Sequence, residues 1–252
     1  MDTKKHVIIV RTLESKWPFG LRANLSRNRP SSRFLFMRIF DYERRYYSKM
    51  SITGIIVAAG KSSRMAPDHK MIMKLNGKTL IERSVDSLLP FCDRIIVVTG
   101  AFHHEIMESL NGKEKVEYIH NSEFEEGMFS SLKTGLKGAP GDRILFLPGD
   151  CPFAEDTVIE EMIDIQDDIV VPEYHGKIGQ PVLFSSSVAE ELLTESHFLT
   201  LREFIRYSDP TLVNVECEEI LWDIDTPEDY ERAERFFCIK EEGSSYVNLL
   251  QA

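Results

Sequence analysis

Two hydrophobic patterns alternate along the chain from Ser51 onward. In the first, apolar residues form short runs bounded by turn residues, which is typical of strands buried in a sheet. In the second, apolar residues recur at helical spacing among polar ones, which predicts helices with one buried face. The expected strands are ITGIIVA (52–58), DRIIVVT (93–99), VEYIH (116–120), DRILFLPG (142–149), DIVVP (168–172), PVLF (181–184), TLVNVE (211–216) and ILWDI (220–224). The expected helices are TLIERSVDSLL (79–89), HHEIMESL (103–110), MFSSLKTGL (128–136), AEDTVIEEMIDI (154–165), SVAEELLTE (187–195) and TPEDYERAERFF (226–237).

This alternation predicts an α/β fold, a Rossmann-like and mostly parallel sheet with helices on both faces. We expect a single domain over residues 50–240 and a C-terminal tail over 241–252. The last helix is expected to begin with Thr226 as its N-cap and Pro227 at its first position. Ligands of such sheets bind at the carboxyl ends of the strands, where the segments AAGKSSRM and PGDCP both fall.

Charge separates the first 49 residues from the rest. Residues 1–49 hold 12 Lys and Arg against 4 Asp and Glu, a net charge of +8, whereas the remaining 203 residues hold 18 against 37, a net charge of −19. The acidic body argues against nucleic-acid binding. The basic extension has no match to the motifs below, and we expect it to be disordered or to precede the true start at Met50, so that a chain starting there folds; a basic arm that binds a membrane surface or a partner is the alternative.

Composition argues against two further classes of protein, those that span a membrane and those held together by disulfides. No apolar run approaches the length of a membrane span. The 4 cysteines show no metal-binding or redox spacing, and a reducing cytoplasm suits them better than a disulfide framework. The stretch from Lys61 to Lys78, however, contains five basic residues and only one acidic residue. Its local positive charge would suit a polyphosphate; a solvated basic surface is the alternative.

The segment GIIVAAGKSSRM, Gly54–Met65, superficially resembles a P-loop. Five residues separate Gly54 from Gly60, one more than a P-loop allows, and they are typical of a buried strand rather than a phosphate-wrapping loop. The small residues and Arg64 nevertheless suit an anion, because they permit close backbone approach and supply a guanidinium fork. A solvated strand-to-helix turn is the alternative at this point.

Acidic residues follow two of the expected strands. Asp150 comes directly after LFLPG, where a carboxylate would face the crevice at the edge of the sheet and could bind Mg²⁺; a simple turn residue is the alternative. Asp223 and Asp225 are two positions apart in LWDIDTPED, where the expected strand ends, and would share a face if the strand continues to Asp225. Strands disfavour Asp, so this pair calls for a cation or, for one member, a helix cap.

Six motifs together resemble the MobA-like NTP transferase family. They are VAAGKSSRM, FCDRIIVVTG, YIHNSEFEEGMFSSL, LPGDCP, GKIGQPVLF and DIDTPEDYERA, and they occur in this order over residues 52–237. The resemblance is greatest to the members that transfer a cytidylyl group to the molybdenum cofactor. It implies a fold of the nucleotide-diphospho-sugar transferase type, transfer of CMP from CTP to the terminal phosphate of molybdopterin with release of pyrophosphate, Mg²⁺ as cofactor, and a molybdoenzyme or its chaperone as a candidate partner.

The resemblance also implies roles for individual residues. Nucleotide binding would fall to the turn after the first strand and to the NSEFEEGMFSSL segment: Ala58, Ala59, Gly60, Lys61, Ser62, Ser63, Arg64, Lys70, Asn121, Gly127, Ser130 and Ser131. Arg64, Lys70 and Asp150 would be catalytic, Asp150 would bind the metal together with Asp223 or Asp225, and Gln180 and Arg202 would face the acceptor.

The chemistry suits these residue types. The attacking phosphate is already ionised, so no side-chain base is required, and cationic groups and alignment lower the barrier between two anions. His103, His104 and His120 lack cysteine partners and helical i, i+4 spacing, and we interpret them as ordinary surface or core histidines.

Two departures from the family pattern matter. Ala66 stands where the family usually has Gly, with one extra residue before Lys70, and Gln180 stands where the family commonly has His. Two alternatives therefore stay open: the same fold acting on another nucleotide such as GTP or another phosphorylated acceptor, and a non-catalytic protein that handles the molybdenum cofactor. Intact Asp150, Asp223 and Asp225 argue against the second.

Overall fold

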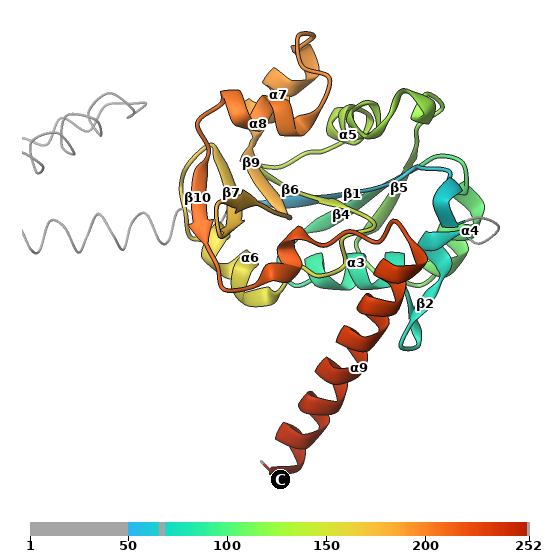
Figure 1. Cartoon of the computed structure of the whole chain (residues 1–252). Helices are drawn as coiled ribbons and strands as arrows, with labels where there is room; N and C mark the ends of the chain where they lie inside the picture. Colours follow the sequence, from blue (N-terminus) through green and yellow to red (C-terminus); the bar gives the residue numbers. More distant parts are fainter. Residues whose placement is uncertain (1–49, 66–68, 251–252) are drawn as a thin grey trace, which may run out of the picture. The chain divides into compact units, whose positions relative to one another are not determined.

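The computed structural model describes residues 50–65 and 69–250 of the chain. The expected N-terminal extension, residues 1–49, lies outside the described residues, as does Ala66. In the described part, strands and helices alternate as the hydrophobic pattern predicts (Figure 1).

The described residues build one sheet of 8 strands, in the order β10–β7–β9–β6–β1–β4–β5, with β8 paired to β7. The strands are β1 (Ile52–Ala58), β4 (Arg94–Thr99), β5 (Val116–His120), β6 (Arg143–Pro148), β7 (Ile169–Tyr174), β8 (Lys177–Ile178), β9 (Val182–Ser185) and β10 (Thr211–Asn214). The pairs β1–β4, β1–β6, β4–β5 and β7–β10 are parallel. β9 runs antiparallel to β6 and β7, and β8 antiparallel to β7, so the sheet is mostly parallel, as expected.

Helices cover both faces of this sheet (Figure 1). The helices α3 (Leu80–Leu88), α4 (His103–Ser109), α6 (Asp156–Ile163) and the start of α9 (Pro227–Leu250) pack on one face. On the other face lie α5 (Met128–Lys137), α7 (Ser186–Thr194) and α8 (Leu201–Tyr207). A small hairpin of β2 (Lys74–Leu75) and β3 (Lys78–Thr79) precedes α3, and the short 3-10 helices are η1 (Ser63–Met65), η2 (Lys70–Ile72), η3 (Phe124–Glu126) and η4 (Glu218–Leu221).

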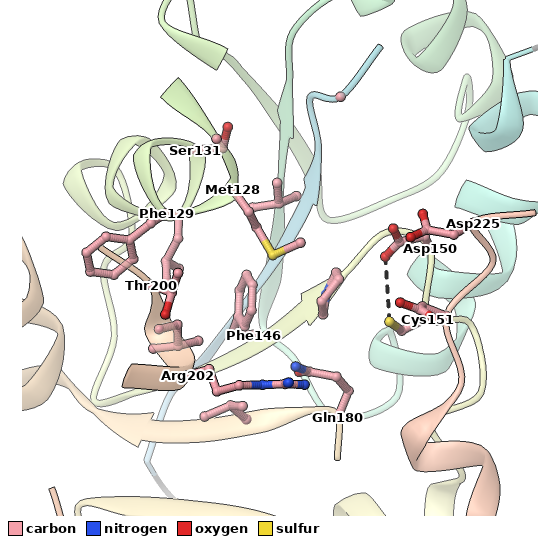
Figure 2. A pocket seen from close by; sticks show the side chains of 18 of the residues that line it. Met128, Phe129, Ser131, Phe146, Asp150, Cys151, Gln180, Thr200, Arg202 and Asp225 are labelled. Atoms are coloured by element: carbon pink, nitrogen blue, oxygen red, sulfur yellow. Dashed lines mark hydrogen bonds between the residues drawn. The ribbon is translucent and has the colours of Figure 1, made fainter. Parts of the chain in front are cut away.

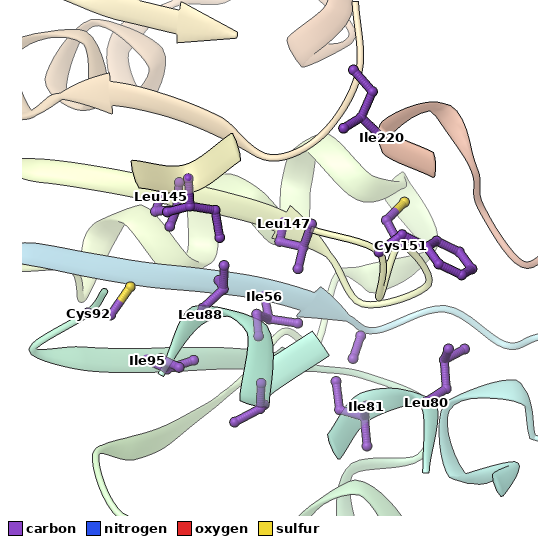
Figure 3. Close-up of a cluster of buried hydrophobic side chains, with 14 of the residues drawn as sticks. Ile56, Leu80, Ile81, Leu88, Cys92, Ile95, Leu145, Leu147, Cys151 and Ile220 are labelled. Atoms are coloured by element: carbon purple, nitrogen blue, oxygen red, sulfur yellow. The ribbon is translucent and has the colours of Figure 1, made fainter. Parts of the chain in front are cut away.

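The central strand β1 is held from both sides. Ile56 and Ala58 belong to the core on the α3 face, whereas Ile55 and Val57 belong to the core on the α5 face. Figure 3 shows Ile56 in the α3-face core, together with residues of α3 and β6. Burial of each large side chain contributes about 1.5–3 kcal/mol. The end of β1 is therefore a rigid base for the turn that follows it.

The last helix begins as predicted but continues further. The amide of Asp229 donates to the Thr226 hydroxyl at 3.2 Å, which confirms Thr226 as its N-terminal cap. The helix runs to Leu250, through the residues that we expected to form a tail. Lys240, Glu241 and Glu242 favour helix, and one Gly within a helix is tolerated.

The expected strand ILWDI is wrong. Its first residues belong to η4, and Trp222–Asp225 follow without joining a ladder; only Trp222, at the end of η4, is given by its backbone angles as extended. The amide of Gln180 donates to the Ile220 carbonyl at 2.8 Å, and the amide of Ile224 donates to the Asp150 carbonyl at 3.0 Å. Loops at the edge of the sheet thus satisfy the backbone of this segment in place of a neighbouring strand. Among the described residues, no helix combines the length and apolar character needed to cross a membrane.

Candidate active site

A large pocket opens at the carboxyl ends of the strands, where ligands of α/β sheets bind. Its volume is about 1210 Å³. The turn after β1, the loop after β6, the first turn of α5, the β8–β9 connection, the first residues of α8 and the segment Trp222–Asp225 all contribute to its wall. Figure 2 shows Asp150 and Asp225 on one side of it and Met128, Phe146, Gln180 and Arg202 on another.

The turn after β1 presents backbone to the pocket. A Cβ on Gly60 would meet nothing within 4 Å, so this residue faces open space. Ser62 adopts a positive φ of 52° and its carbonyl accepts from the Met65 amide at 2.9 Å, which closes a tight turn. The Ser62 hydroxyl is buried without a hydrogen-bond partner and lies in the wall of the pocket. This turn therefore offers polar groups at the place where the sequence predicts a nucleotide.

The first turn of α5 forms another part of the wall. Gly127, with φ of 103°, caps this helix in a backbone conformation that favours glycine. Buried Asn121 donates to the hydroxyls of Ser130 and Ser131 at 3.1 and 3.0 Å, and it accepts from the Glu123 amide at 3.0 Å. Asn121 thus fixes the helix start, whose free N–H groups and dipole favour an anion.

The three carboxylates of Asp150, Asp223 and Asp225, here called the acidic cluster, lie on the opposite side of the pocket. The Lys70 ammonium donates to Asp150 Oδ2 at 2.8 Å, to Asp225 Oδ1 at 2.8 Å and to the Ile224 carbonyl at 2.9 Å. Arg64 forms a second ion pair with Asp225. On its other oxygen, Asp150 accepts a hydrogen bond from the Cys151 thiol at 3.5 Å (Figure 2).

These contacts shift the pKa values of the cluster. Burial alone would lower the pKa of Lys70, but Asp150 and Asp225 outweigh burial and raise it. The hydrogen bond from Lys70 lowers the pKa of Asp225, with a smaller contribution from Arg64. Burial, followed by repulsion from Asp225 and Asp150, raises the pKa of Asp223. A cation placed near Asp223 would relieve that repulsion.

The donor set suits a divalent metal by chemistry, because carboxylate oxygens are the ligands that Mg²⁺ prefers. In the structure, however, Lys70 stands between Asp150 and Asp225, where we expected the metal. The described residues contain no group of three or more His, Cys, Asp or Glu side chains arranged to hold a metal ion. The metal-binding roles of these aspartates stay predictions.

Gln180 and Arg202, to which the resemblance assigns the acceptor, both line the pocket. Gln180 precedes a cis peptide bond to Pro181, and its side-chain oxygen is buried without a partner. Figure 2 shows Arg202 extending across the same region of the pocket. Lys177 and Arg206 also line the pocket, so together with Arg202 they offer three cationic side chains to an anionic ligand.

The pocket wall includes most of the predicted site residues: Ala59, Gly60, Ser62, Ser63, Arg64, Lys70, Gly127, Ser131, Asp150, Gln180, Arg202, Asp223 and Asp225. Four others are not part of the wall: Ala58, Lys61, Asn121 and Ser130. Ala58 is buried in the core, Lys61 pairs with Glu125, and Asn121 and Ser130 hold the start of α5. These four can support the site but do not line it.

Sequence reasoning missed several wall residues. Met128, Phe129 and Phe146 supply apolar surface, and Thr200 and Leu201 begin the unexpected helix α8. A signal for α8 was present, because Thr200 accepts from the Glu203 amide at 3.1 Å in a Thr-x-x-Glu pattern typical of helix starts. The three histidines lie apart from the pocket wall: His103 bonds to Thr99 at 2.7 Å, and its ring is 5.3 Å from those of His104 and His120.

Comparisons with known proteins agree with this geometry. The chain is 29% identical over 181 residues to the molybdenum cofactor cytidylyltransferase of Escherichia coli (strain K12), which covers 71% of this chain and 94% of that protein. It is 32% identical over 123 residues to the bifunctional protein GlmU of Francisella tularensis subsp. novicida, covering 47% of this chain and only 26% of that longer protein. The structure of a nucleotidyl transferase from Methanothermobacter thermautotroptrophicus superimposes with a TM-score of 0.65 and 27% identity, covering 75% of this chain and 99% of that one.

The family assignment rests on a direct match. Residues 54–211 match the model of the MobA-like NTP transferase domain, and this range contains the β1 turn, the start of α5, Asp150 and Gln180. The fold, the pocket at the carboxyl ends of the strands and the relatives agree with that match. The chain belongs to the MobA-like NTP transferase family, and it is a nucleotidyltransferase.

Proposed function

We propose that this enzyme transfers CMP from CTP to the phosphate of the molybdopterin cofactor and releases pyrophosphate. The observation that carries the proposal is the meeting of Lys70, Asp150 and Asp225 in one pocket with the β1 turn and the start of α5. Further support comes from the cytidylyltransferase of Escherichia coli, which is similar over 94% of its own length.

The reaction follows from the charges in the pocket. An oxygen of the acceptor phosphate attacks the α-phosphorus of CTP, and the bond from that phosphorus to the bridging oxygen breaks. Pyrophosphate leaves with the electron pair, and no proton has to be removed from the attacking oxygen. Catalysis therefore requires alignment of two anions and compensation of their charge, which cationic side chains and oriented N–H groups provide.

We assign the nucleotide to the β1 turn and α5. The open backbone at Gly60, the unpartnered Ser62 hydroxyl and the N–H groups at the start of α5 would contact the phosphates. Arg64 is 72% exposed and can move to a phosphate at little cost. Asp150 and Asp225, with Asp223 beside them, would hold Mg²⁺, which supplies positive charge for the leaving pyrophosphate.

We assign the acceptor to the side that Gln180 and Arg202 line. Arg202 and the neighbouring Lys177 and Arg206 would bind acceptor phosphate oxygens. The buried oxygen of Gln180 lacks a donor, so a ring N–H of the acceptor would satisfy it. Gln carries no charge at neutral pH, unlike the His found there in many members of the family.

Pyrophosphate release tests the proposal. The full chain should release pyrophosphate with CTP, Mg²⁺ and molybdopterin, much more slowly with GTP, ATP or UTP, and hardly at all without acceptor. Release with CTP and a phosphosugar but not with molybdopterin would show that the acceptor is a phosphosugar instead of molybdopterin. Tight molybdopterin binding without release under any nucleotide would identify a cofactor-handling protein.

A further inference from the structure

The Lys70 ammonium bridges two segments that are far apart in the sequence. Lys70 begins η2, Asp150 follows β6, and Asp225 precedes α9. The lysine side chain is only 11% exposed and the Asp150 side chain 17%, so this pair is largely removed from water. With two carboxylates and the Ile224 carbonyl as acceptors, the ammonium uses all three of its N–H donors.

Other cations near the pocket are held differently. Arg64 is largely exposed and bonds to the Asp225 oxygen that Lys70 does not use. Lys61 is exposed, bonds to Glu125 and does not line the pocket. Lys70 therefore compensates the negative charge of the acidic cluster from a largely buried position, whereas Arg64 does so from an exposed one.

We propose that Lys70 occupies the cation position of the free enzyme, so that a divalent metal binds well only once the lysine has moved to the phosphates of the nucleotide. The proposal rests on the proposed function, because it assumes that the acidic cluster receives the metal of the nucleotide. On this proposal, binding of the nucleotide raises the affinity for the metal and binding of the metal raises the affinity for the nucleotide. Lys70 is the residue that couples the two binding steps.

The physical reason is competition for the same oxygens. A metal that binds Asp150 and Asp225 requires the lone pairs that now accept from Lys70. Without nucleotide, a displaced ammonium would lose three hydrogen bonds in a poorly hydrated place, which disfavours metal binding. A triphosphate in the pocket offers new acceptors, and the flexible lysine stem allows the transfer without movement of the backbone.

Manganese binding measures this coupling directly. Free Mn²⁺ is quantified by electron paramagnetic resonance for the full chain and for Lys70→Met, which keeps the apolar stem and removes the charge. Each protein is titrated alone and with a CTP analogue whose α,β-bridge is methylene, so that no turnover occurs. Lys113→Met is the matched control, because Lys113 is also partly buried and paired with an acid, Asp86, away from the pocket.

Without nucleotide, Lys70→Met should bind Mn²⁺ about tenfold more tightly than the wild type, and Lys113→Met should match the wild type. Addition of the analogue should improve Mn²⁺ affinity strongly in the wild type and only weakly in Lys70→Met. Equal, weaker or undetectable Mn²⁺ binding by Lys70→Met without nucleotide would overturn the proposal, provided that its melting temperature shows a folded protein. If that protein is unfolded, Lys70→Gln serves as the second variant and is judged by the same criterion.

The outcome is separable from that of the proposed function. Tighter Mn²⁺ binding by Lys70→Met does not depend on the identity of the nucleotide base or of the acceptor. If the enzyme proves to use another acceptor, the coupling still holds. If pyrophosphate is released from CTP but the variant gains no Mn²⁺ affinity, the transferase function stands and the role of Lys70 is refuted.

Discussion

Replacement of Asp150 by Asn tests the centre of the site. The substitution keeps the size of the side chain and a carbonyl that can accept from Lys70, but it removes the charge. Lys70 retains Asp225 at 2.8 Å and the Ile224 carbonyl at 2.9 Å, so the ammonium is not left unpaired. We therefore expect a loss of only about 1–2 kcal/mol in the free energy of unfolding, below the cost of an isolated buried charge. For a domain of this size that corresponds to a fall of about 2–8 °C in melting temperature.

The effect of Asp150→Asn on turnover should be much larger than its effect on stability. Two unit charges about 4 Å apart at an effective dielectric near 20 interact by about 4 kcal/mol, so removal of the carboxylate strongly weakens the hold on a cation. We expect turnover to fall at least about 100-fold, which corresponds to about 2.7 kcal/mol of transition-state stabilisation. The assay is CTP-dependent pyrophosphate release over a range of Mg²⁺ concentrations, together with calorimetric melting.

The matched control is Asp168→Asn, which removes an exposed carboxylate just before β7 and outside the pocket wall. Excess Mg²⁺ should restore part of the lost turnover if the metal is bound more weakly. Near-normal turnover of Asp150→Asn would refute the assignment of Asp150 to the metal. A drop in melting temperature well beyond the expected range would show that the carboxylate mainly maintains the fold.

Three further predictions concern the base, the acceptor and pH. Ala59 is 3% exposed and borders the pocket, where its Cβ would crowd a purine more than the smaller cytosine. We therefore expect CTP to be preferred to GTP and Ala59→Gly to reduce that preference; equal turnover of the wild type with both nucleotides would contradict this. Gln180→Ala should raise the KM for the acceptor about tenfold and leave the Kd for CTP nearly unchanged, and a comparable loss of CTP affinity in calorimetry would place Gln180 on the nucleotide side. Because Lys70 lowers the pKa of Asp225, their pairing stabilises the fold above the ordinary Asp pKa and is lost as pH falls through the lowered value. Urea midpoints measured below about pH 4 should therefore fall more steeply in the wild type than in Asp225→Asn, and parallel curves would argue against this pairing in solution.

The β1 turn and the sheet were predictable because their signals are local. Gly60 to Arg64 follow a single apolar run, and the uninterrupted sequence Ile55, Ile56 and Val57 is typical of a strand buried on both faces. The place of Asp150 at the edge of the sheet follows from β6 in the same way.

The contacts of Lys70 were not predictable because they are long-range. Lys70 meets residues 80 and 155 positions away, and no pattern around it indicates which oxygens it will contact. A strand was predicted next to Asp223 and Asp225 because ILWDI is an apolar run with Ile224 between the two acids. A loop segment packed on the core can have the same apolar pattern, so whether it joins a ladder depends on what lies beside it.

The antiparallel strand β9 sets apart the hairpin that contains Gln180. β8 pairs antiparallel with the end of β7, and β9 pairs antiparallel with its start, so the segment between β7 and β9 folds back as a hairpin. Residues inserted or exchanged within this hairpin would not change the register in which β1 pairs with β4 and β6. Under the proposed assignment of the acceptor to this hairpin, evolution could change the acceptor while it keeps the β1 turn and the start of α5 for the nucleotide.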